Sequence, residues 1–384
     1  MRKIWIAWLL ACLMAVSACA EGIVYTADQD DQSAVDVSGT ESIVITDARI
    51  LKTGGSASSA DAASFRGVNS AVRVYDQAAL TISNSTIEAT AQNATGVFAY
   101  DGGTINISDC TVTVTGGGAG GVQVAGGGSL YGSNLTVTSA SKAAIRSDRG
   151  GGTMVLDGGT YTSTGTNGCP AIYSTAEITV RNAECVSEQS RAVIIEGMNS
   201  VTLENVTIEG SDQSTKQGSI HANVLLYQSA SGDAKEGTSV FSMTGATMTS
   251  HSGAMFYCTN TASVINLNDA ALNLSGDGSL LIVSAGRWGK DGRNGGRCTL
   301  NAEHQTLTGS ITVDSISTLS INMTESDFTG SINAEQEGGT VHVTMDEGSS
   351  WTLTGDSYVT SFSGNLQSIH ANGYHLFVDG TEIL

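Results

Sequence analysis

Four carboxylates each follow a strand-like segment in the repeats of this sequence. They are the group of acidic residues best placed for acid–base chemistry. They are Asp76, Asp101, Asp148 and Glu196. Hydrolysis of a sugar bond by a general acid and a general base needs two carboxylates that flank one bond. The alternative, which we favour, is a set of turn residues facing water. The sequence therefore predicts no catalytic residue, no cofactor and no metal site, and its balance is against an enzyme.

A second set of side chains suits ligand binding. In the segments before those carboxylates every second residue is expected to point outward from a strand. These outward residues are Arg73, Phe98, Gln123, Arg146, Tyr173 and Ile194. Stacked about 4.8 Å apart in water, they would form a ribbon for an extended polymer, with rings as platforms and guanidinium groups as donors. Arg73, Phe98, Arg146 and Tyr173 are the candidate ligand-binding residues; the alternative is an ordinary surface.

Arg287 and Trp288 complete the candidate ligand-binding residues. They lie in a Gly-rich segment that also carries Lys290, Arg293 and Arg297, a group of cations in an acidic chain. A protruding Trp flanked by Arg fits a contact point for a ligand. The alternative is a loop that folds its Trp over the body of the protein as a lid.

One column of residues explains how such side chains are positioned. Between Asn84 and Asn205, an Asn, Asp or Gly recurs in steps of 23 to 25 residues, with apolar residues two before and three after. The full column is Asp47, Asn84, Asp109, Asn134, Gly158, Asn182, Asn205, Gly245 and Asp269. Gly132 is an exception among the flanking apolar residues. These residue types enter the left-handed backbone region at little cost, so each can make the same sharp bend. A bend at fixed intervals is typical of a solenoid.

Three strands alternating apolar and polar residues are predicted in each repeat. Inward residues of the first strand should stack into one column: Val72, Val97, Val122, Ile145, Ile172 and Val193. A single Pro and 47 Gly in 384 residues agree with hydrogen-bonded coils joined by tight corners. The sequence predicts an all-β parallel β-helix with three sheets and roughly eleven coils, forming one domain over residues 34–384. The segments 227–239 and 285–297 should protrude as loops.

The N-terminus has the features of an export signal. Arg2 and Lys3 precede an apolar stretch, and the segment Val16-Ser17-Ala18-Cys19 has the form of a bacterial lipobox. We expect residues 1–18 to be the signal, Cys19 to carry a lipid and residues 19–33 to be a tether. Cleavage after Ala20, which would leave a secreted protein, is the alternative. The protein is thus expected at the cell envelope, held to the membrane by lipid alone, or outside the cell.

The net charge narrows the possible partners, and the positions of the cysteines indicate the role of these residues. The formal net charge of −20 disfavours nucleic acid. Cys185 is expected at the inward site of Ile87 and Ile208, and Cys298 at the inward site of Leu80. We therefore interpret the cysteines after the signal as buried apolar residues. The disulfide status of Cys110, Cys169 and Cys258 stays open.

The repeats Ala71–Ile87, Val97–Val112 and Val193–Ile208 resemble the right-handed parallel β-helix of pectin-lyase-like proteins, and the fuller run is similar to the exported adhesin-like group. The resemblance rests on the segment from Ala192 to Leu203, on Arg287-Trp288-Gly289 and on Asp314-Ser315-Ile316-Ser317. It implies a right-handed helix, an asparagine ladder at the bends, and export. The Asn-Thr-Asp and Gly-His-Gly motifs of polygalacturonases are absent.

The prediction that follows is a non-enzymatic surface protein, adhesin-like or glycan-binding, whose partner is an extracellular polysaccharide or a component of a host or cell surface. Two alternatives stay open. One is a polysaccharide lyase or glycoside hydrolase of the same fold. The other is a structural spacer without a specific ligand.

Overall fold

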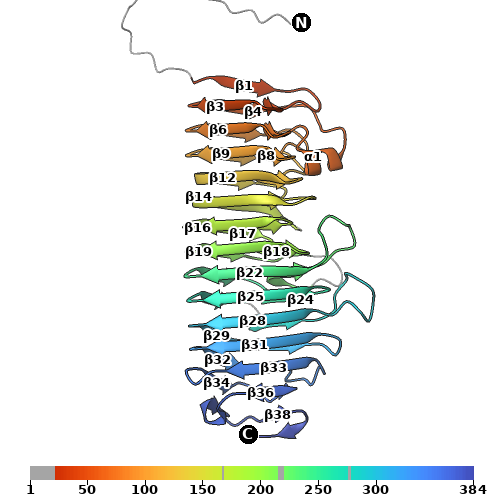
Figure 1. The fold of residues 1–384 in the computed structure, drawn as a ribbon, viewed down its shortest axis with the longest axis vertical. Coiled ribbons are helices and arrows are strands. Elements are labelled where there is room, and N and C mark those ends of the chain that lie inside the picture. Colours follow the sequence, from red (N-terminus) through yellow and green to blue (C-terminus); the bar gives the residue numbers. More distant parts are fainter. Residues whose placement is uncertain (1–21, 167, 215–219, 276–277) are drawn as a thin grey trace, which may run out of the picture.

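The chain forms a long rod of stacked coils (Figure 1). The computed structural model describes residues 22–384 except residues 167, 215–219 and 276–277. Its strands form parallel sheets of 21, 11 and 4 strands, and a small 3-stranded sheet lies near the C-terminus. The predicted fold, an all-β right-handed parallel β-helix, is confirmed.

The 11-stranded sheet contains the first strand of each coil, and each strand pairs in parallel with those of the coils before and after it. We call it the first-strand sheet. Its members are β2 (Val35–Val37), β5 (Val72–Val74), β8 (Val97–Tyr100), β11 (Val122–Ala125), β13 (Ile145–Ser147), β15 (Ile172–Ser174), β18 (Val193–Glu196), β21 (Ala222–Tyr227), β24 (Ala254–Thr259), β27 (Ser279–Val283) and β30 (Ser310–Val313).

The second strands form a longer stack. They are β3 (Ser42–Thr46), β6 (Ala79–Ser83), β9 (Thr104–Ser108), β12 (Gly128–Ser139), β14 (Gly152–Thr166), β16 (Glu177–Arg181), β19 (Ser200–Glu204), β22 (Thr238–Thr244), β25 (Ala262–Asn268), β28 (Arg297–Glu303), β31 (Thr318–Thr324), β33 (Thr340–Met345) and β36 (Ser361–Ser363). This stack contains more strands than the roughly eleven coils that were expected, because the rod continues beyond β30 with β33 and β36.

The third strand of each coil follows the bend. Strands β12 and β14 continue through the bend without a break, so the second and third strands belong to one 21-stranded sheet. The third strands are β1 (Val24–Ala27), β4 (Arg49–Lys52), β7 (Thr86–Ala89), β10 (Thr111–Val114), β17 (Glu184–Gln189), β20 (Thr207–Gly210), β23 (Thr247–Ser250) and β26 (Ala271–Leu274). The 4-stranded sheet continues them with β29 (Thr306–Thr308), β32 (Asp327–Gly330), β34 (Ser350–Leu353) and β37 (Ile369–His370). The elements that remain are β35 (Ser357–Val359), β38 (Leu376–Val378), β39 (Thr381–Glu382), the helix α1 (Ala60–Arg66) and the 3₁₀ turn η1 (Leu366–Ser368).

The bend column has the predicted backbone at all nine positions. Its φ angles lie between 48° and 74°. His304 and Glu325 continue the column with φ angles of 51° and 45°, and their side chains form an ion pair at 2.9 Å. Side-chain amides also link neighbouring bends: the Asn205 amide donates to Asn182 at 3.3 Å, and the Asn134 amide donates to Asp109 at 3.3 Å. The Asn182 amide donates to Asp157, the residue before the bend at Gly158, at 2.8 Å.

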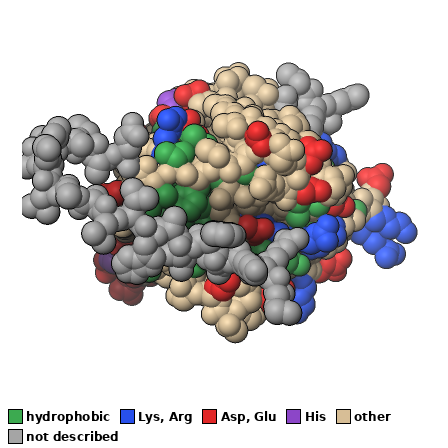
Figure 2. Space-filling model, turned by 90° about the horizontal axis from the view of Figure 1, so that it is seen from above, with side chains coloured by type: hydrophobic (Ala, Val, Ile, Leu, Met, Phe, Trp, Pro, Cys, Tyr) green, Lys and Arg blue, Asp and Glu red, His purple; other side chains and the backbone are tan. Residues whose placement is uncertain are grey.

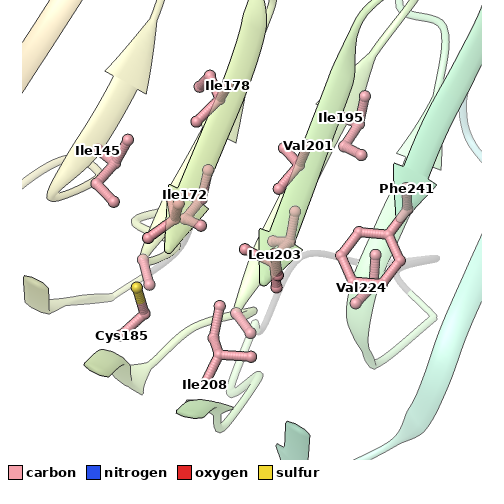
Figure 3. Close-up of a cluster of buried hydrophobic side chains, with 14 of the residues drawn as sticks. Ile145, Ile172, Ile178, Cys185, Ile195, Val201, Leu203, Ile208, Val224 and Phe241 are labelled. Carbon is pink, nitrogen blue, oxygen red and sulfur yellow. The ribbon is translucent and has the colours of Figure 1, made fainter. Parts of the chain in front are cut away.

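The core is the predicted apolar column. Val72, Val97, Val122, Ile145, Ile172 and Val193 pair in register, and all are fully buried. Figure 3 shows how such residues from successive coils fill the interior. The exception at Gly132 is explained by packing, because a Cβ there would lie 2.7 Å from the Leu156 side chain and 2.8 Å from that of Leu135.

All five cysteines after residue 21 are buried, as expected for small apolar residues. Cys185 pairs with Ile208 in register, which confirms its predicted site. The site predicted for Cys298 is wrong by two residues: Cys298 pairs with Ser263 and Leu319, while Leu300 pairs with Ile265 in the Leu80 column.

Several features differ from expectation. Strand β1 pairs with β4, so the chain from Val24 onward belongs to the rod and not to the tether that was expected at residues 19–33. Helix α1 was not predicted, although Ser59 caps its first turn and Gly67 ends it at a φ of 64°. The loops 228–237 and 284–296 protrude as predicted, on the side of the rod where Figure 1 shows α1. No helix in the described residues is long and apolar enough to cross a membrane.

The bend column gives a direct test of the fold. Asn182→Val places a β-branched side chain at a φ of 49° and removes the amide ladder. We expect it to lower the free energy of unfolding by about 1–3 kcal/mol in urea denaturation. Asn106→Val is the matched control, because Asn106 is exposed and points outward from β9. Equal midpoints for the two variants would contradict the role of the bend.

Candidate functional site

A pocket of about 380 Å³ lies on the outer face of the first-strand sheet. Its floor crosses five successive strands, β13, β15, β18, β21 and β24, whose outward residues pair in register: Arg146, Tyr173, Ile194, Leu225 and Tyr257. Its other described lining residues are Ser141, Lys142, Gly168, Cys169, Ser190, Arg191, Asp212, Ser214, Ile220, Tyr227, Arg287 and Trp288.

Four of the six predicted ligand-binding residues meet in this pocket. Arg146 and Tyr173 lie in its floor, and Arg287 and Trp288 reach it from the loop 284–296. The Trp288 ring packs on Tyr227 with centroids 5.2 Å apart, and the Arg287 guanidinium lies 4.2 Å from the Trp288 ring. Of the two expectations for Trp288, the structure shows the one in which the loop folds this side chain over the body of the protein. Trp288 thus forms part of the pocket wall.

Arg73 and Phe98 do not take part in this pocket. Arg73 lies over the Tyr75 ring at 3.9 Å and donates to the Arg66 carbonyl at 2.8 Å. Phe98 is fully buried, in close contact with Gly67 at the end of α1. The expectation that Phe98 stands in water is wrong, because an unpredicted helix covers this part of the sheet.

A polar network begins under α1 and ends in the pocket. Gln123 donates to the Ser64 carbonyl at 2.9 Å and to Asp148 at 2.7 Å. Asp148 accepts two bonds from Arg146, at 2.7 and 2.9 Å. Burial raises the pKa of Asp148, and the Arg146 charge opposes this shift. The Arg146 side chain is only 12% exposed, so the expectation that it stands in water is also wrong.

The network continues through a buried carboxylate. Glu196, which is 1% exposed, accepts hydrogen bonds from Tyr173 at 2.6 Å, from Tyr227 at 2.9 Å and from Ser229. The Arg146 guanidinium lies 4.7 Å from the Tyr173 ring centroid, which connects the two halves of the network. Burial raises the pKa of Tyr173 and of Tyr227, so both phenols stay protonated and act as donors.

The four carboxylates of the sequence do not form one column. Asp76 and Asp101 are exposed turn residues with φ angles of 55° and 48°, as the favoured interpretation expected. Asp148 and Glu196 lie two residues after the outward-pointing residue of their strand. Asp76 and Asp101 lie three residues after the equivalent residue of theirs. This one-residue difference places Asp148 and Glu196 on the covered face of the sheet, buried and hydrogen-bonded, so that interpretation is wrong for this pair.

Arg191 is a site residue that the sequence did not reveal. It is 8% exposed and forms an ion pair with Asp212 at 2.9 Å through Nη2, which also donates to the Ile220 carbonyl at 2.7 Å. Its Nη1 is buried without a hydrogen-bond partner in the described part of the chain. Burial lowers the pKa of Arg191, but a guanidinium keeps its proton at neutral pH. A buried donor without a partner is costly, so an anionic oxygen that reached this atom would be stabilised there.

Lys142 adds a second unpredicted cation. Its ammonium group donates to the Ser64 hydroxyl of α1 at 2.7 Å. Burial lowers the pKa of Lys142 to about 8, and the neighbouring Arg146 charge acts in the same direction. The described lining thus holds Lys142, Arg146, Arg191 and Arg287 against one carboxylate, Asp212.

The positive lining contrasts with the rest of the surface. The chain carries a net charge of −20, and acidic side chains appear on several sides of the rod when it is seen end-on (Figure 2). Within the described residues no three His, Cys, Asp or Glu side chains gather closely enough to hold a metal ion. The arrangement therefore fits recognition of an anionic group at a surface that contains four aromatic rings and four cations.

The charge state of Lys142 can be measured. We expect its amine to titrate near pH 8, well below the ordinary value for lysine, because burial favours the uncharged form. NMR titration of isotope-labelled lysine side chains, with Lys142→Arg to assign the signal, measures this pKa. A midpoint at the ordinary lysine value would contradict the buried position.

No protein-family model, curated protein or solved structure matches this chain. The resemblance to pectin-lyase-like proteins is therefore supported for the parallel β-helix architecture alone. The function must be argued from the pocket.

Proposed function

We propose that this protein binds a glycan in the pocket on its first-strand sheet, as an adhesin-like protein of the cell surface. The observation that supports the proposal most is the meeting of Arg146, Tyr173, Arg287 and Trp288 at one pocket, from two distant parts of the chain. Aromatic rings beside guanidinium groups supply apolar faces for sugar rings and donors for their oxygens.

The shape of the pocket supports an oligosaccharide. Five neighbouring strands at about 4.8 Å spacing give a floor roughly 20 Å long, directed along the rod axis. A volume of about 380 Å³ is within the usual range of small-molecule sites. An apolar cluster that includes Ile194, Leu225 and Tyr257 lies beneath it, with Trp288 packed against its edge. A sugar chain would thus lie along the axis with ring faces on this cluster.

The charges of the pocket favour a sugar that bears a carboxylate. Arg191 Nη1 lacks a partner among the described residues, and Arg287 is exposed at the rim. A carboxylate oxygen at Nη1 would satisfy this buried donor and would receive a charge-assisted hydrogen bond. A neutral sugar would offer a weaker acceptor, so an acidic sugar is the ligand class that we propose.

Hydrolysis of the glycan is not favoured by the same geometry. Two carboxylates must reach one glycosidic bond. Among the described lining residues only Asp212 is acidic, and Arg191 pairs with it at 2.9 Å. Glu196 and Asp148 are bound to hydroxyl groups and to Arg146, which leaves them as structural acceptors.

Eliminative cleavage is the second candidate function, and Lys142 is the observation that favours it. With a pKa of about 8, Lys142 is a general base matched to mildly alkaline solution. In an elimination the base removes the proton next to a sugar carboxylate, a double bond forms, and the glycosidic oxygen leaves with a proton. Ultraviolet absorbance of the unsaturated product would reveal this activity, and its loss in Lys142→Arg would assign the base.

Export and anchoring belong to the same proposal. Cys19 and the signal segment lie outside the described residues, so their roles rest on the sequence pattern. A lipid on Cys19 would place the rod on the outside of a membrane, where the pocket meets extracellular glycans. The mass of the N-terminal peptide from native protein decides between a lipid-bearing Cys19 and a chain that begins after Ala20.

Binding can be tested by calorimetry with a tetrasaccharide of a uronic acid and with its methyl ester. We expect the acid to bind at least about tenfold more tightly, because the ester removes the charge that faces Arg191. Trp288→Ala and Arg287→Gln should each weaken binding of the acid by about 2- to 30-fold, since contacts of this kind are worth roughly 0.5–2 kcal/mol.

Lys290→Gln is the matched control. Lys290 lies in the same loop, is exposed and does not line the pocket, so the charge change is the same and binding should be retained. Arg146→Ala is avoided because it would leave the buried Asp148 without its cation. Failure of both sugars to bind, or equal affinity of all variants, would reject the pocket as the site.

A further inference from the structure

Two buried thiols lie side by side in the core. The sulfur atoms of Cys258 and Cys298 are 3.5 Å apart, and the residues are 0% and 4% exposed. They come from β24 in the first-strand sheet and from β28 in the following coil. The thiols of Cys110 and Cys169 instead donate to the carbonyl oxygens of Ser108 and Ser141.

The chain geometry that brings them together is specific. After Cys258 the chain passes through β25, β26, β27 and the loop 284–296 before β28 returns above the starting coil. At the end of this loop, a Cβ on Gly296 would lie 2.6 Å from the Cys258 carbonyl oxygen. Glycine at this position therefore permits the close approach that places Cys298 against Cys258.

We propose that Cys258 and Cys298 form an intramolecular disulfide when the chain folds in the presence of a disulfide donor. One thiolate attacks the donor, forms a mixed disulfide and releases one donor thiol. The second thiolate then attacks the protein sulfur of the mixed disulfide and releases the other donor thiol. The two cysteines lose two electrons and two protons, and the donor takes up both.

The burial of the pair determines when this reaction occurs. The contact with the Cys258 thiol, together with burial, raises the pKa of Cys298 well above its usual value, so the folded core disfavours the thiolate. A donor molecule also has no open path to either sulfur once the coils have stacked. The disulfide therefore forms during folding and resists both reduction and late oxidation afterwards.

The disulfide would covalently link the two ends of the segment that contains the loop 284–296. It would join residues 40 apart in sequence and enclose the whole segment that carries Arg287 and Trp288. A crosslink of this span restricts the unfolded chain and so stabilises the folded one. The inference depends on the thiol geometry and not on any ligand, so it stands apart from glycan binding.

Refolding the chain with oxidised and reduced glutathione, or with reductant alone, tests the proposal. Limited trypsin cleavage in the exposed loop, at Arg287, Lys290 or Arg293, then cuts between the two cysteines. We expect the two fragments to stay joined on a non-reducing gel after oxidative refolding and to separate after reduction. The oxidised chain should also melt about 5 °C higher.

Control variants separate this pair from the other cysteines. A Cys258→Ala, Cys298→Ala variant should give separate fragments under all conditions, and a Cys110→Ala, Cys185→Ala variant should behave as the parent. Peptide mapping that finds Cys258 and Cys298 unlinked after oxidative refolding, or linked to other cysteines, would overturn the proposal. So would crosslinking of the folded, reduced chain at the rate seen during refolding, because the core would then be open to the donor.

Discussion

In-register hydrogen bonding between successive coils is the constraint on which the rest of this molecule depends. Because the strands of the 21-, 11- and 4-stranded sheets pair in parallel with their neighbours, a residue in one coil lies directly above its equivalent in the preceding coil. A requirement at one position is thereby imposed on a whole column. The bend residues show this most clearly, since all nine predicted positions adopt a left-handed backbone and several link through their amides. The same rule aligns the aliphatic core.

The same constraint explains where a site can arise. Regular coils offer only a flat sheet face, so a pocket needs additional chain at the corners to form its walls. The loop 284–296 supplies Arg287 and Trp288, and the segments before β15, β18 and β21 supply Cys169, Arg191 and Asp212. Helix α1 and the loop 228–237 pack beside this region, and Arg149 joins them, with its guanidinium 4.2 Å from the Phe65 ring of α1 and 2.6 Å from Asp233. The outward residues of five coils then become a floor, and the Trp288 loop encloses them.

The sequence could predict the positions that follow the repeat, and it could not predict the contacts made by segments inserted between the strands. The bends, the core column and the outward positions of Arg146 and Tyr173 followed from spacing, because a period of about 24 residues fixes the register. The burial of Phe98 did not, since it depends on the path of α1 across the sheet. Arg191 and Lys142 lie outside the strands, where no repeat marks their direction. His304 and Glu325 were missed because neither is Asn, Asp or Gly, the residue types by which the bend column was recognised.

The position of a bound acidic oligosaccharide is the measurement that tests this account most directly. Crystals of the protein soaked with a uronic acid tetrasaccharide should show the sugar chain along the rod axis over β13 to β24. One carboxylate oxygen should lie within hydrogen-bond distance of Arg191 Nη1, and a sugar ring should face Trp288. A sugar bound on another face of the rod, or an empty pocket at saturating concentration, would contradict the assignment of the first-strand sheet as the binding surface.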